Sequence, residues 1–326
     1  MKVAVLGAGA WGTALALTLH RRLHDVVLWG HDVDHLKEIR RSRRNERYLP
    51  GIDLPRNWEF EPDMARAVSD AECAVVAVPS KAIRAATKVL SDYAGIVVSV
   101  AKGIECDTGL TMCGVLRANA PKAKFAALSG PTLALEVARG VPTATVAASE
   151  DPVIAQTVQE MFHGPLLRVY TSTDLIGVEM GGALKNVVAI AAGVGDGFGF
   201  GDNSKAALLT RGIVEIRRLG VACGAQSETF AGLSGLGDLT VTCFSKLSRN
   251  RGFGEKLGQG GKLEEILASS VSVAEGYPTA LAAYGLARKL KLVTPIIDEV
   301  HAVLYEGKQV GKALKDLIGR ESKAED

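Results

Sequence analysis

The pattern of apolar and polar positions divides the chain into two halves, and in the first half two kinds of segment alternate. Short apolar runs bounded by turn residues are typical of buried parallel strands. They lie at 2–7, 25–30, 71–80, 95–103, 124–131 and 143–149. Helical spacing of apolar residues is found at 11–23, 34–44 and 151–164. Strands that alternate with helices predict an α/β fold with a doubly wound parallel sheet. The last helix opens with Asp151 as its expected cap and Pro152 in its first turn.

From about Asp174 the pattern changes to long stretches of helical spacing without convincing strands. These stretches cover 174–195, 203–222, 247–258, 275–290 and 294–306. The pattern therefore predicts two domains: a sheet domain over 1–175 and an all-helical domain over 176–320. The charged residues 321–326 form a tail that we expect to fray.

Composition and charge narrow the class of protein. Apolar residues make up 47% of the 326 positions, which predicts a packed globular protein. The net charge of +2 is too close to zero to indicate a nucleic-acid or membrane-surface protein. The first strand begins almost at the N-terminus, and no uncharged apolar run approaches the ~18 residues of a membrane span. We therefore expect a cytoplasmic protein without a signal peptide.

The five cysteines form no CxxC pair and have no metal-ligand spacing. They are Cys73, Cys106, Cys113, Cys223 and Cys243. We expect buried, unreactive thiols in a reducing compartment and no metal site.

A glycine motif links the first predicted strand to the first predicted helix. Gly7, Gly9 and Gly12 form a GxGxxG sequence, and a second strand ends some 20 residues later, as in Rossmann-type dinucleotide-binding domains. Gly7 allows the tight turn, Gly9 lets the backbone approach a pyrophosphate, and Gly12 lets helix and strand pack closely. The alternative is a glycine-rich turn that binds nothing.

The residues at the end of the second predicted strand help to distinguish an NAD site from an NADP site. An NAD site usually places an acid there to bind the ribose 2′-hydroxyl. Here Gly30 and His31 occupy that position, Asp32 follows, and a basic run extends from Arg40 to Arg47. We predict that His31 and a nearby arginine meet a 2′-phosphate, so that NADP(H) is preferred and NAD(H) is also accepted. The alternative is that the basic run is only a solvated surface.

Lys185 stands in an otherwise apolar helical stretch of the second half. Gly181, Gly182, Ala189 and Ala192 share its face by helical spacing, and we expect these small residues to leave room for a ligand. Burial tends to lower the pKa of a lysine, which suits proton transfer to or from an alcohol. The alternative is a lysine that extends to the surface at a domain interface.

Other polar residues mark a second part of the site. Ser248, Arg249, Asn250 and Arg251 begin a predicted helix, where hydroxyl, guanidinium and amide donors favour phosphate binding. Lys102 follows a buried strand, at the edge of an α/β sheet where ligands bind. Asp238 stands in a glycine-rich stretch that we expect to be a turn. Lys102 as a surface charge and Asp238 as a turn former remain open alternatives.

Nine sequence blocks, in order along almost the whole chain, carry a resemblance to a known family. They are GAGAWGTALA, LWGHD, VPS, AKGIE, SGPTLALEVARGVPT, GGALKNVVAIAAG, GLGDLTVTC, SRNRGFG and AEGYPT. With these blocks the chain resembles the bacterial NAD(P)-dependent sn-glycerol-3-phosphate dehydrogenases. The resemblance implies a cytoplasmic enzyme, commonly a homodimer, that interconverts glycerol 3-phosphate and dihydroxyacetone phosphate and supplies phospholipid synthesis.

The resemblance also implies roles for individual residues. Lys185 matches the family's proton acceptor, and Lys102 matches a contact to both substrate and cofactor. Further substrate contacts are implied at Gly130, Thr132, Asp238, Ser248, Arg249 and Asn250. Cofactor contacts are implied at Ala10, Trp11, His31, Ala134, Arg249, Val273 and Glu275.

Three positions depart from the family's pattern. Ala10 replaces a frequent serine, which puts a side-chain role there in doubt, and Leu133 and Leu135 replace a phenylalanine and a lysine. Two other functions stay open at this point. One is a related dehydrogenase acting on a 3-hydroxy acid or a sugar acid, which would leave the donors from Ser248 onward idle. The other is a sensor that binds the dinucleotide without turnover.

Overall fold

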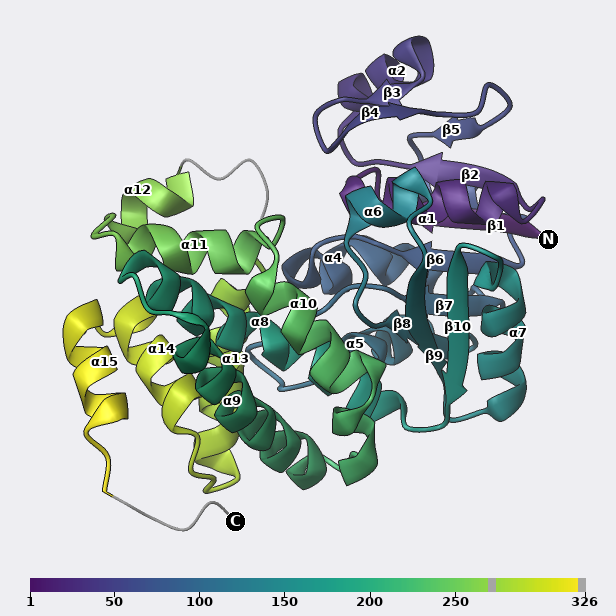
Figure 1. Cartoon of the computed structure of the whole chain (residues 1–326). Helices are drawn as coiled ribbons and strands as arrows, with labels where there is room; N and C mark the ends of the chain where they lie inside the picture. Colours follow the sequence, from purple (N-terminus) through teal and green to yellow (C-terminus); the bar gives the residue numbers. More distant parts are fainter. Residues whose placement is uncertain (269–273, 322–326) are drawn as a thin grey trace.

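Figure 1 shows the computed structural model of the chain, which describes residues 1–268 and 274–321. Within these residues, an eight-stranded sheet with flanking helices forms the N-terminal half, and helices form the C-terminal half. We call 1–173 the sheet half and 174–321 the helical half. The predicted α/β class and the predicted helical second half are both confirmed.

The main sheet has the strand order β10-β9-β8-β7-β6-β1-β2-β5. Its strands are β1 (Lys2–Leu6), β2 (Asp25–Trp29), β5 (Glu59–Glu61), β6 (Cys73–Val76), β7 (Ile96–Ser99), β8 (Lys124–Ser129), β9 (Thr143–Ala148) and β10 (Leu167–Ser172). β1 pairs in parallel with β2 on one side and with β6 on the other, so the strand order reverses beside β1. In open α/β sheets this reversal is the topological switch point, where ligands bind.

The sheet departs from the parallel pattern at β9. β9 pairs antiparallel with β8, and β10 then pairs in parallel with β9. The connection between β8 and β9 contains only the short helix α6 (Ala134–Arg139), which packs on α1 (Ala10–Arg21). Because the chain turns back at the carboxyl end of β8, β9 runs the opposite way. The apolar pattern did not reveal this, because the last four residues of β9 are buried, as in the parallel strands β6 and β7.

Helices and a small hairpin complete the sheet half. The remaining helices are α2 (Val33–Ser42), α3 (Met64–Val68), α4 (Ile83–Ala86), α5 (Met112–Asn119) and α7 (Pro152–Phe162). The Asp151 carboxylate caps α7 by accepting the Val153 N–H at 2.9 Å, as predicted. The helix predicted over 34–44 ends at Ser42, because Arg43 adopts a left-handed conformation (φ 57°). The basic run therefore continues into the hairpin of β3 (Arg44–Asn45) and β4 (Leu49–Asp53), not along a helix.

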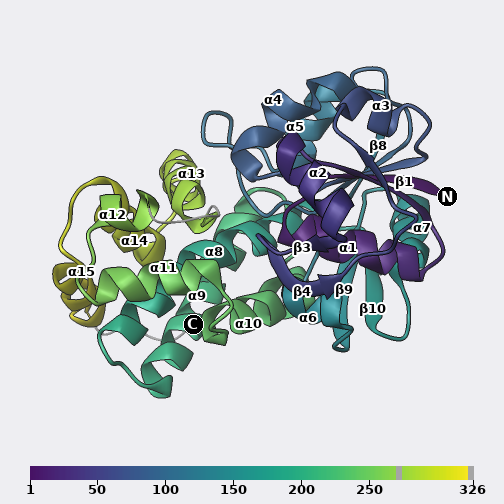
Figure 2. The same cartoon turned by 90° about the horizontal axis from the view of Figure 1, so that it is seen from above.

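The helical half is built around one long helix, α8 (Leu175–Gly197), which lies next to the sheet and contacts most other helices of this half (Figure 2). The others are α9 (Asp202–Ala222), α10 (Asp238–Phe244), α11 (Arg249–Gly258), α12 (Leu263–Ala268), α13 (Gly276–Lys289), α14 (Pro295–Tyr305) and α15 (Val310–Ile318). By length and composition α8 could cross a membrane, but 89% of its most apolar window is buried among other parts of the protein. It also carries Glu179 and Lys185, so it is the core helix of this half.

Glycines bring α8 and α11 into close contact. A Cβ atom at Gly193 would collide with the Arg251 carbonyl, and one at Gly254 would collide with the Ile190 carbonyl. The two backbones therefore approach more closely than side chains would allow. This contact fixes the start of α11 relative to Lys185 on α8.

All five cysteines are free thiols. Cys73, Cys113 and Cys243 are buried as expected, and burial raises the pKa of each thiol. Cys223 is half-buried and Cys106 is exposed, so the expectation of burial is wrong for Cys106. Cys106 lies in the loop after β7, where its thiol donates to the Pro278 carbonyl of α13 at 3.5 Å.

Candidate active site

The glycine motif forms an open cradle at the end of β1. Gly7 has φ 139°, and a Cβ atom there would lie 2.6 Å from the Ala77 carbonyl oxygen. A Cβ atom at Gly12 would collide with the Gly7 carbonyl, whereas Gly9 has nothing within 4 Å of the corresponding position. Gly9 is also the N-cap of α1, whose first-turn N–H groups have no intrahelical acceptor. The cradle fits the pyrophosphate of a dinucleotide.

Asn45 supports this cradle from the β3–β4 hairpin. Its buried side-chain amide donates to the Ala8 carbonyl at 3.0 Å and to the Thr13 hydroxyl at 2.8 Å. Asn45 was not predicted from the sequence, because it lies inside a basic run whose only visible signal is charge. Ala10 and Trp11 begin α1 and are half-buried, and Trp11 Nε1 has no hydrogen-bond partner within 1–268 and 274–321. An unpaired donor at this place is consistent with a ligand beside the loop.

His31 is exposed just beyond β2. The neighbouring Asp32 already has a hydrogen-bond partner and an ion-pair partner within the protein. Its carboxylate caps α2 by accepting the His35 N–H at 3.0 Å, and this hydrogen bond lowers the pKa of Asp32. Asp32 also pairs with Arg47 at 3.3 Å. Arg44 pairs instead with Asp53 in the hairpin, at 2.7 Å. Of the basic run, Arg47 is thus held next to the end of β2.

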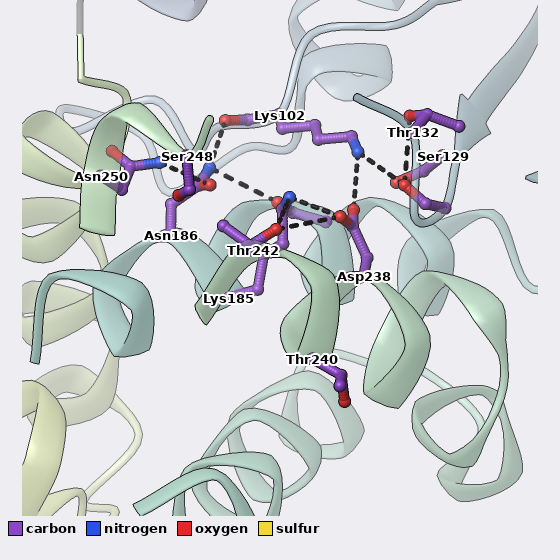
Figure 3. A network of polar contacts seen from close by, with 12 residues as sticks. Lys102, Ser129, Thr132, Lys185, Asn186, Asp238, Thr240, Thr242, Ser248 and Asn250 are labelled. Atoms are coloured by element: carbon purple, nitrogen blue, oxygen red, sulfur yellow. Dashed lines mark hydrogen bonds and ion pairs between the residues drawn. The ribbon is translucent and has the colours of Figure 1, made fainter. Parts of the chain in front are cut away.

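Two lysines from the two halves share one buried carboxylate (Figure 3). Lys185 Nζ lies 2.5 Å from Asp238 Oδ1, and Lys102 Nζ lies 2.6 Å from Asp238 Oδ2. Lys185 comes from α8, Asp238 from α10 and Lys102 from the segment after β7. Asp238 is only 1% exposed, and burying a charge is tolerated when it is paired and hydrogen-bonded. With both lysines protonated, the cluster has a net positive charge.

Lys185 is buried, and the alternative of an exposed lysine is wrong. It donates to the Thr242 hydroxyl at 2.6 Å besides its pairing with Asp238. Burial, assisted by repulsion from Lys102, lowers the pKa of Lys185 to about 8 even though Asp238 favours the charged form. Two parts of the prediction need correction. Gly181 lies against Ser234 and Gly182 against Ser129, so the space beside these glycines is filled by other parts of the protein and not by a ligand. Asp238 is the first residue of α10 and does not stand in a turn.

Lys102 is held at the carboxyl edge of the sheet by a second contact. Its Nζ donates to the Gly130 carbonyl at 3.0 Å, and the Thr132 hydroxyl donates to the same oxygen at 3.1 Å. Ala134 begins α6 directly afterwards. The structure thus brings Lys102, Gly130 and Thr132 together beside Lys185 and Asp238, whereas His31 lies beyond β2, at another part of the same sheet edge.

The start of α11 lies next to the lysines. Ser248 is the N-cap of α11, and its oxygen accepts the Arg251 N–H at 3.2 Å, which leaves the hydroxyl hydrogen for another partner. The Asn250 side chain donates to Asn186 at 2.8 Å and accepts the Gly276 N–H at 2.9 Å. Arg249 is exposed at this end of the helix. Arg251 instead points into the fold, where it pairs with Asp196 at 2.6 Å, so it serves packing and not the site.

Asn186 and Thr242 belong to this network but were missed from the sequence. Asn186 donates to the Lys102 carbonyl at 3.3 Å, which joins the helical half to the sheet half. Two signals were present: Asn186 directly follows Lys185, and Thr242 is four residues after Asp238 on the same helical face. Thr240, on the same helix, points away from the network (Figure 3).

Glu275 precedes α13 and contacts the sheet half. Its carboxylate accepts the Ser80 N–H at 3.0 Å and, in a short hydrogen bond, the Ser80 hydroxyl. Val273 lies outside the described residues. The site therefore combines a nucleotide cradle after β1 with a lysine–aspartate cluster after β7 and β8 and with the start of α11. Such a set can bind a dinucleotide, exchange a proton and hold an anionic group.

Comparisons with known proteins agree with this geometry. Residues 2–155 match the family model described as NAD-dependent glycerol-3-phosphate dehydrogenase N-terminus, and residues 174–315 match the one described as its C-terminus. The chain is 46% identical to a glycerol-3-phosphate dehydrogenase [NAD(P)+] of Syntrophotalea carbinolica, over 100% of this chain and 99% of that one. It is 47% identical to the protein of the same name from Geobacter sulfurreducens, over 99% and 98%.

Solved structures give the same result. A glycerol-3-phosphate dehydrogenase from Coxiella burnetii is similar with a TM-score of 0.94 and 36% identity, over 98% of this chain and 99% of that one. The corresponding enzyme of Saccharomyces cerevisiae has a TM-score of 0.83 and 26% identity, over 98% and 99%.

Proposed function

The chain belongs to the family of NAD-dependent glycerol-3-phosphate dehydrogenases, and on this basis we propose roles for the residues of its site. The chain is an oxidoreductase that interconverts sn-glycerol 3-phosphate and dihydroxyacetone phosphate with NAD(P)(H). Neither a 3-hydroxy-acid or sugar-acid dehydrogenase nor a non-catalytic sensor is favoured by these relatives. The observation that carries the proposed roles is the shared, buried Asp238 between Lys102 and Lys185.

Lys185 exchanges the proton with the C2 oxygen of the substrate. In reduction the ammonium gives a proton to this oxygen, and in oxidation the neutral amine takes it back. A pKa of about 8 supports this role, because both protonation states are then accessible near neutral pH. Asp238 and Thr242 hold the amine in place, since both accept hydrogen bonds from Nζ.

Lys102 helps to bind the C2 oxygen and to polarise it. Its contacts to Asp238 and the Gly130 carbonyl support this role, because they fix Nζ next to Lys185 before any ligand arrives. We also propose substrate contacts at Gly130 and Thr132, which lie beside Lys102. Asp238 balances the two lysines and so keeps the site from binding anions indiscriminately.

The start of α11 binds the phosphate of the substrate. The Ser248 hydroxyl, the Asn250 amide and the Arg249 guanidinium are the donors at this end of the helix, whose N-terminus favours an anion. Asn250 contacts Asn186, the neighbour of Lys185, which supports a phosphate bound close to the reacting carbon. Anchoring the phosphate holds C2 near Lys185.

The cofactor, when bound, supplies or accepts the hydride. We propose that the cradle of Gly7, Gly9, Ala10, Trp11 and Gly12 holds its pyrophosphate. The fit of the cradle supports this, since Gly9 faces open space and α1 begins there. His31, Lys102, Ala134, Arg249, Val273 and Glu275 are the further proposed contacts.

We also propose the division into a dinucleotide-binding domain (1–175) and a substrate-binding domain (176–320), and a cytoplasmic homodimer that serves phospholipid synthesis. Five free thiols support a reducing compartment. Sedimentation equilibrium tests the dimer: a mass of 34.3 kDa, that of one chain, would contradict it. Cell fractionation tests the location.

The phosphate site is tested with two ketones. We expect efficient reduction of dihydroxyacetone phosphate with NADPH or NADH and little reduction of dihydroxyacetone, because the α11 donors bind a part of the substrate that does not react. The measurement is kcat/KM for both ketones, followed by nicotinamide absorbance. Similar values for the two would contradict a phosphate site at α11.

A further inference from the structure

Ser80 and Glu275 join the two halves of the chain at the end of β6. Ser80 opens a short 3-10 turn after β6, and Glu275 directly precedes α13. Although 195 positions separate them, one Glu275 oxygen accepts the Ser80 N–H at 3.0 Å and the other accepts the Ser80 hydroxyl. A carboxylate that accepts two hydrogen bonds from one residue is held in a defined orientation.

This contact lies beside the switch point of the sheet. β6 neighbours β1, and the Ala77 carbonyl that follows β6 lies against Gly7 of the nucleotide cradle. Ser80 is three residues further along the same segment. The Ser80–Glu275 contact therefore links α13 to the edge of the crevice in which a dinucleotide binds.

Ser80 packs closely against the segment that carries Lys102. A Cβ atom at Gly103 would lie 2.5 Å from the Ser80 Cβ and 2.8 Å from its hydroxyl oxygen. Only glycine at position 103 lets the segment after β7 pack this closely on Ser80. The glycine of the AKG sequence is thereby explained.

The start of α13 is also tied to the substrate side. Gly276, next to Glu275, donates to Asn250; Asn250 donates to Asn186; and Asn186 donates to the Lys102 carbonyl. The chain of hydrogen bonds thus returns to the sheet half one residue before Gly103. The α13 N-terminus is held at two places, once by Ser80 and once by this amide chain.

We propose that Ser80 is a positioning residue for dinucleotide binding: it holds the Glu275 carboxylate and the start of α13 in the arrangement that the bound cofactor requires. This inference rests on the proposed function, in that the ligand is NAD(P)(H). It assigns Ser80 no contact with the reacting atoms. Loss of the Ser80 hydroxyl therefore weakens cofactor binding much more than it slows the chemical step.

The test compares Ser80→Ala with a matched control, Thr108→Ala. Thr108 donates its hydroxyl to the Glu105 carboxylate at 2.6 Å, but both residues belong to one exposed loop of the sheet half. NADPH is titrated into each protein by fluorescence without substrate, and kcat and KM are then measured with dihydroxyacetone phosphate. A hydrogen bond to a charged group corresponds to about tenfold or more in affinity. We expect Ser80→Ala to raise the Kd of NADPH about tenfold while kcat falls less than threefold, and Thr108→Ala to leave both unchanged.

A second pair of variants separates positioning from general destabilisation. If Ser80 acts through Glu275, the double variant Ser80→Ala/Glu275→Ala binds NADPH within about twofold of Glu275→Ala alone, because the partner is already gone. Losses that multiply in the double variant would overturn the proposal, as would an unchanged or lower Kd in Ser80→Ala. A wild-type protein that binds NADPH but does not reduce dihydroxyacetone phosphate would count against the proposed function instead.

Discussion

At the scale of single residues, the proposed proton transfer depends on how three charges are balanced, two of them buried and the third, on Lys102, half-buried. Asp238 is shared by Lys102 and Lys185, so neither lysine has a carboxylate to itself. Burial can then lower the pKa of Lys185 to about 8, which a fully paired lysine would resist. The carboxylate orients both amines, and the second lysine makes the first a better proton donor.

Replacing Lys185 by alanine tests its role in proton transfer. We expect kcat to fall by roughly two to four powers of ten, the usual contribution of a general acid–base group, with a smaller effect on cofactor affinity. Lys205→Ala is the matched control, because Lys205 is also a largely buried lysine paired with an aspartate, Asp196 at 2.7 Å. Its kcat should stay within about threefold of wild type. Near-normal turnover of Lys185→Ala would make this lysine purely structural.

The pH dependence should have opposite signs in the two directions. Below a pKa of about 8 Lys185 is protonated and can donate, so kcat/KM for dihydroxyacetone phosphate should be level there and fall above it. Oxidation of glycerol 3-phosphate needs the neutral amine, so its kcat/KM should rise with pH up to about 8 and then level off. Profiles measured in both directions check this. The same sign in both, or an unchanged inflection in Lys185→Ala, would assign the pKa to another group.

At the scale of elements, the site depends on the close contact of α8 with α11. Gly193 of α8 and Gly254 of α11 each lie against the backbone of the other helix. The N-terminus of α11 therefore lies next to the part of α8 that carries Lys185, without an intervening layer of side chains. Regular helical packing with larger residues would keep the two axes 8–10 Å apart. We expect that the proposed phosphate donors and the proposed proton donor would then lie too far apart to act on one small substrate.

Two glycines of α11 provide a test within one helix. Gly254→Ala should lower the free energy of unfolding by about 1–3 kcal/mol and raise the KM for dihydroxyacetone phosphate, because its Cβ would collide with the Ile190 carbonyl. Gly252→Ala is the control: nothing lies within 4 Å of its Cβ position, so alanine should raise the free energy of unfolding by about 0.5–1 kcal/mol. Urea denaturation measures both. Equal effects of the two substitutions would mean that α11 is not closely packed at Gly254.

At the scale of the whole molecule, the candidate site lies along one edge of the sheet, and residues of the helical half complete it from the other side. The nucleotide cradle follows β1, His31 follows β2, and Lys102 and Gly130 follow β7 and β8. These strands are parallel to one another, so their carboxyl ends share that edge. α8, α10, α11 and α13 then add Lys185, Asp238, Ser248 and Glu275 from the other side.

We expect cofactor choice to be decided at this scale, by where the hairpin of β3 and β4 places its arginines. One Asp32 oxygen accepts the His35 N–H at the start of α2 and the other pairs with Arg47, so both oxygens already have partners within the protein. We therefore expect both nicotinamides to work, with kcat/KM about tenfold or more higher for NADPH, the effect of one charged contact to the 2′-phosphate. Arg47→Ala should reduce the preference, and Arg44→Ala, whose side chain pairs with Asp53, should not. A tenfold preference for NADH, measured at the same salt concentration, would contradict this.

The local pattern was sufficient for most elements and for part of the site. The strands with the strongest apolar runs and all five predicted helices of the second half exist where their periodicity placed them. The helices α3, α4, α6 and α12 were missed, because segments of four to six residues do not complete enough turns to show a period. The strands β3, β4, β5 and β10 and the helices α5, α10 and α15 were not predicted either. The direction of β9 was missed as well, since a buried strand looks the same in either direction.

What the sequence determined by itself was therefore local: element type, the glycine cradle after β1, and the residue types able to transfer a proton or bind a phosphate. These depend on spacing within a few turns or a single loop. The tertiary structure alone decided which of them meet. Asp238 lies 53 positions from Lys185 and 136 from Lys102, Asn45 lies 32 from Thr13, and Ser80 lies 195 from Glu275. No short-range pattern encodes such pairs, because they form only when elements far apart in the sequence pack together. The same packing creates the burial that lowers the pKa of Lys185.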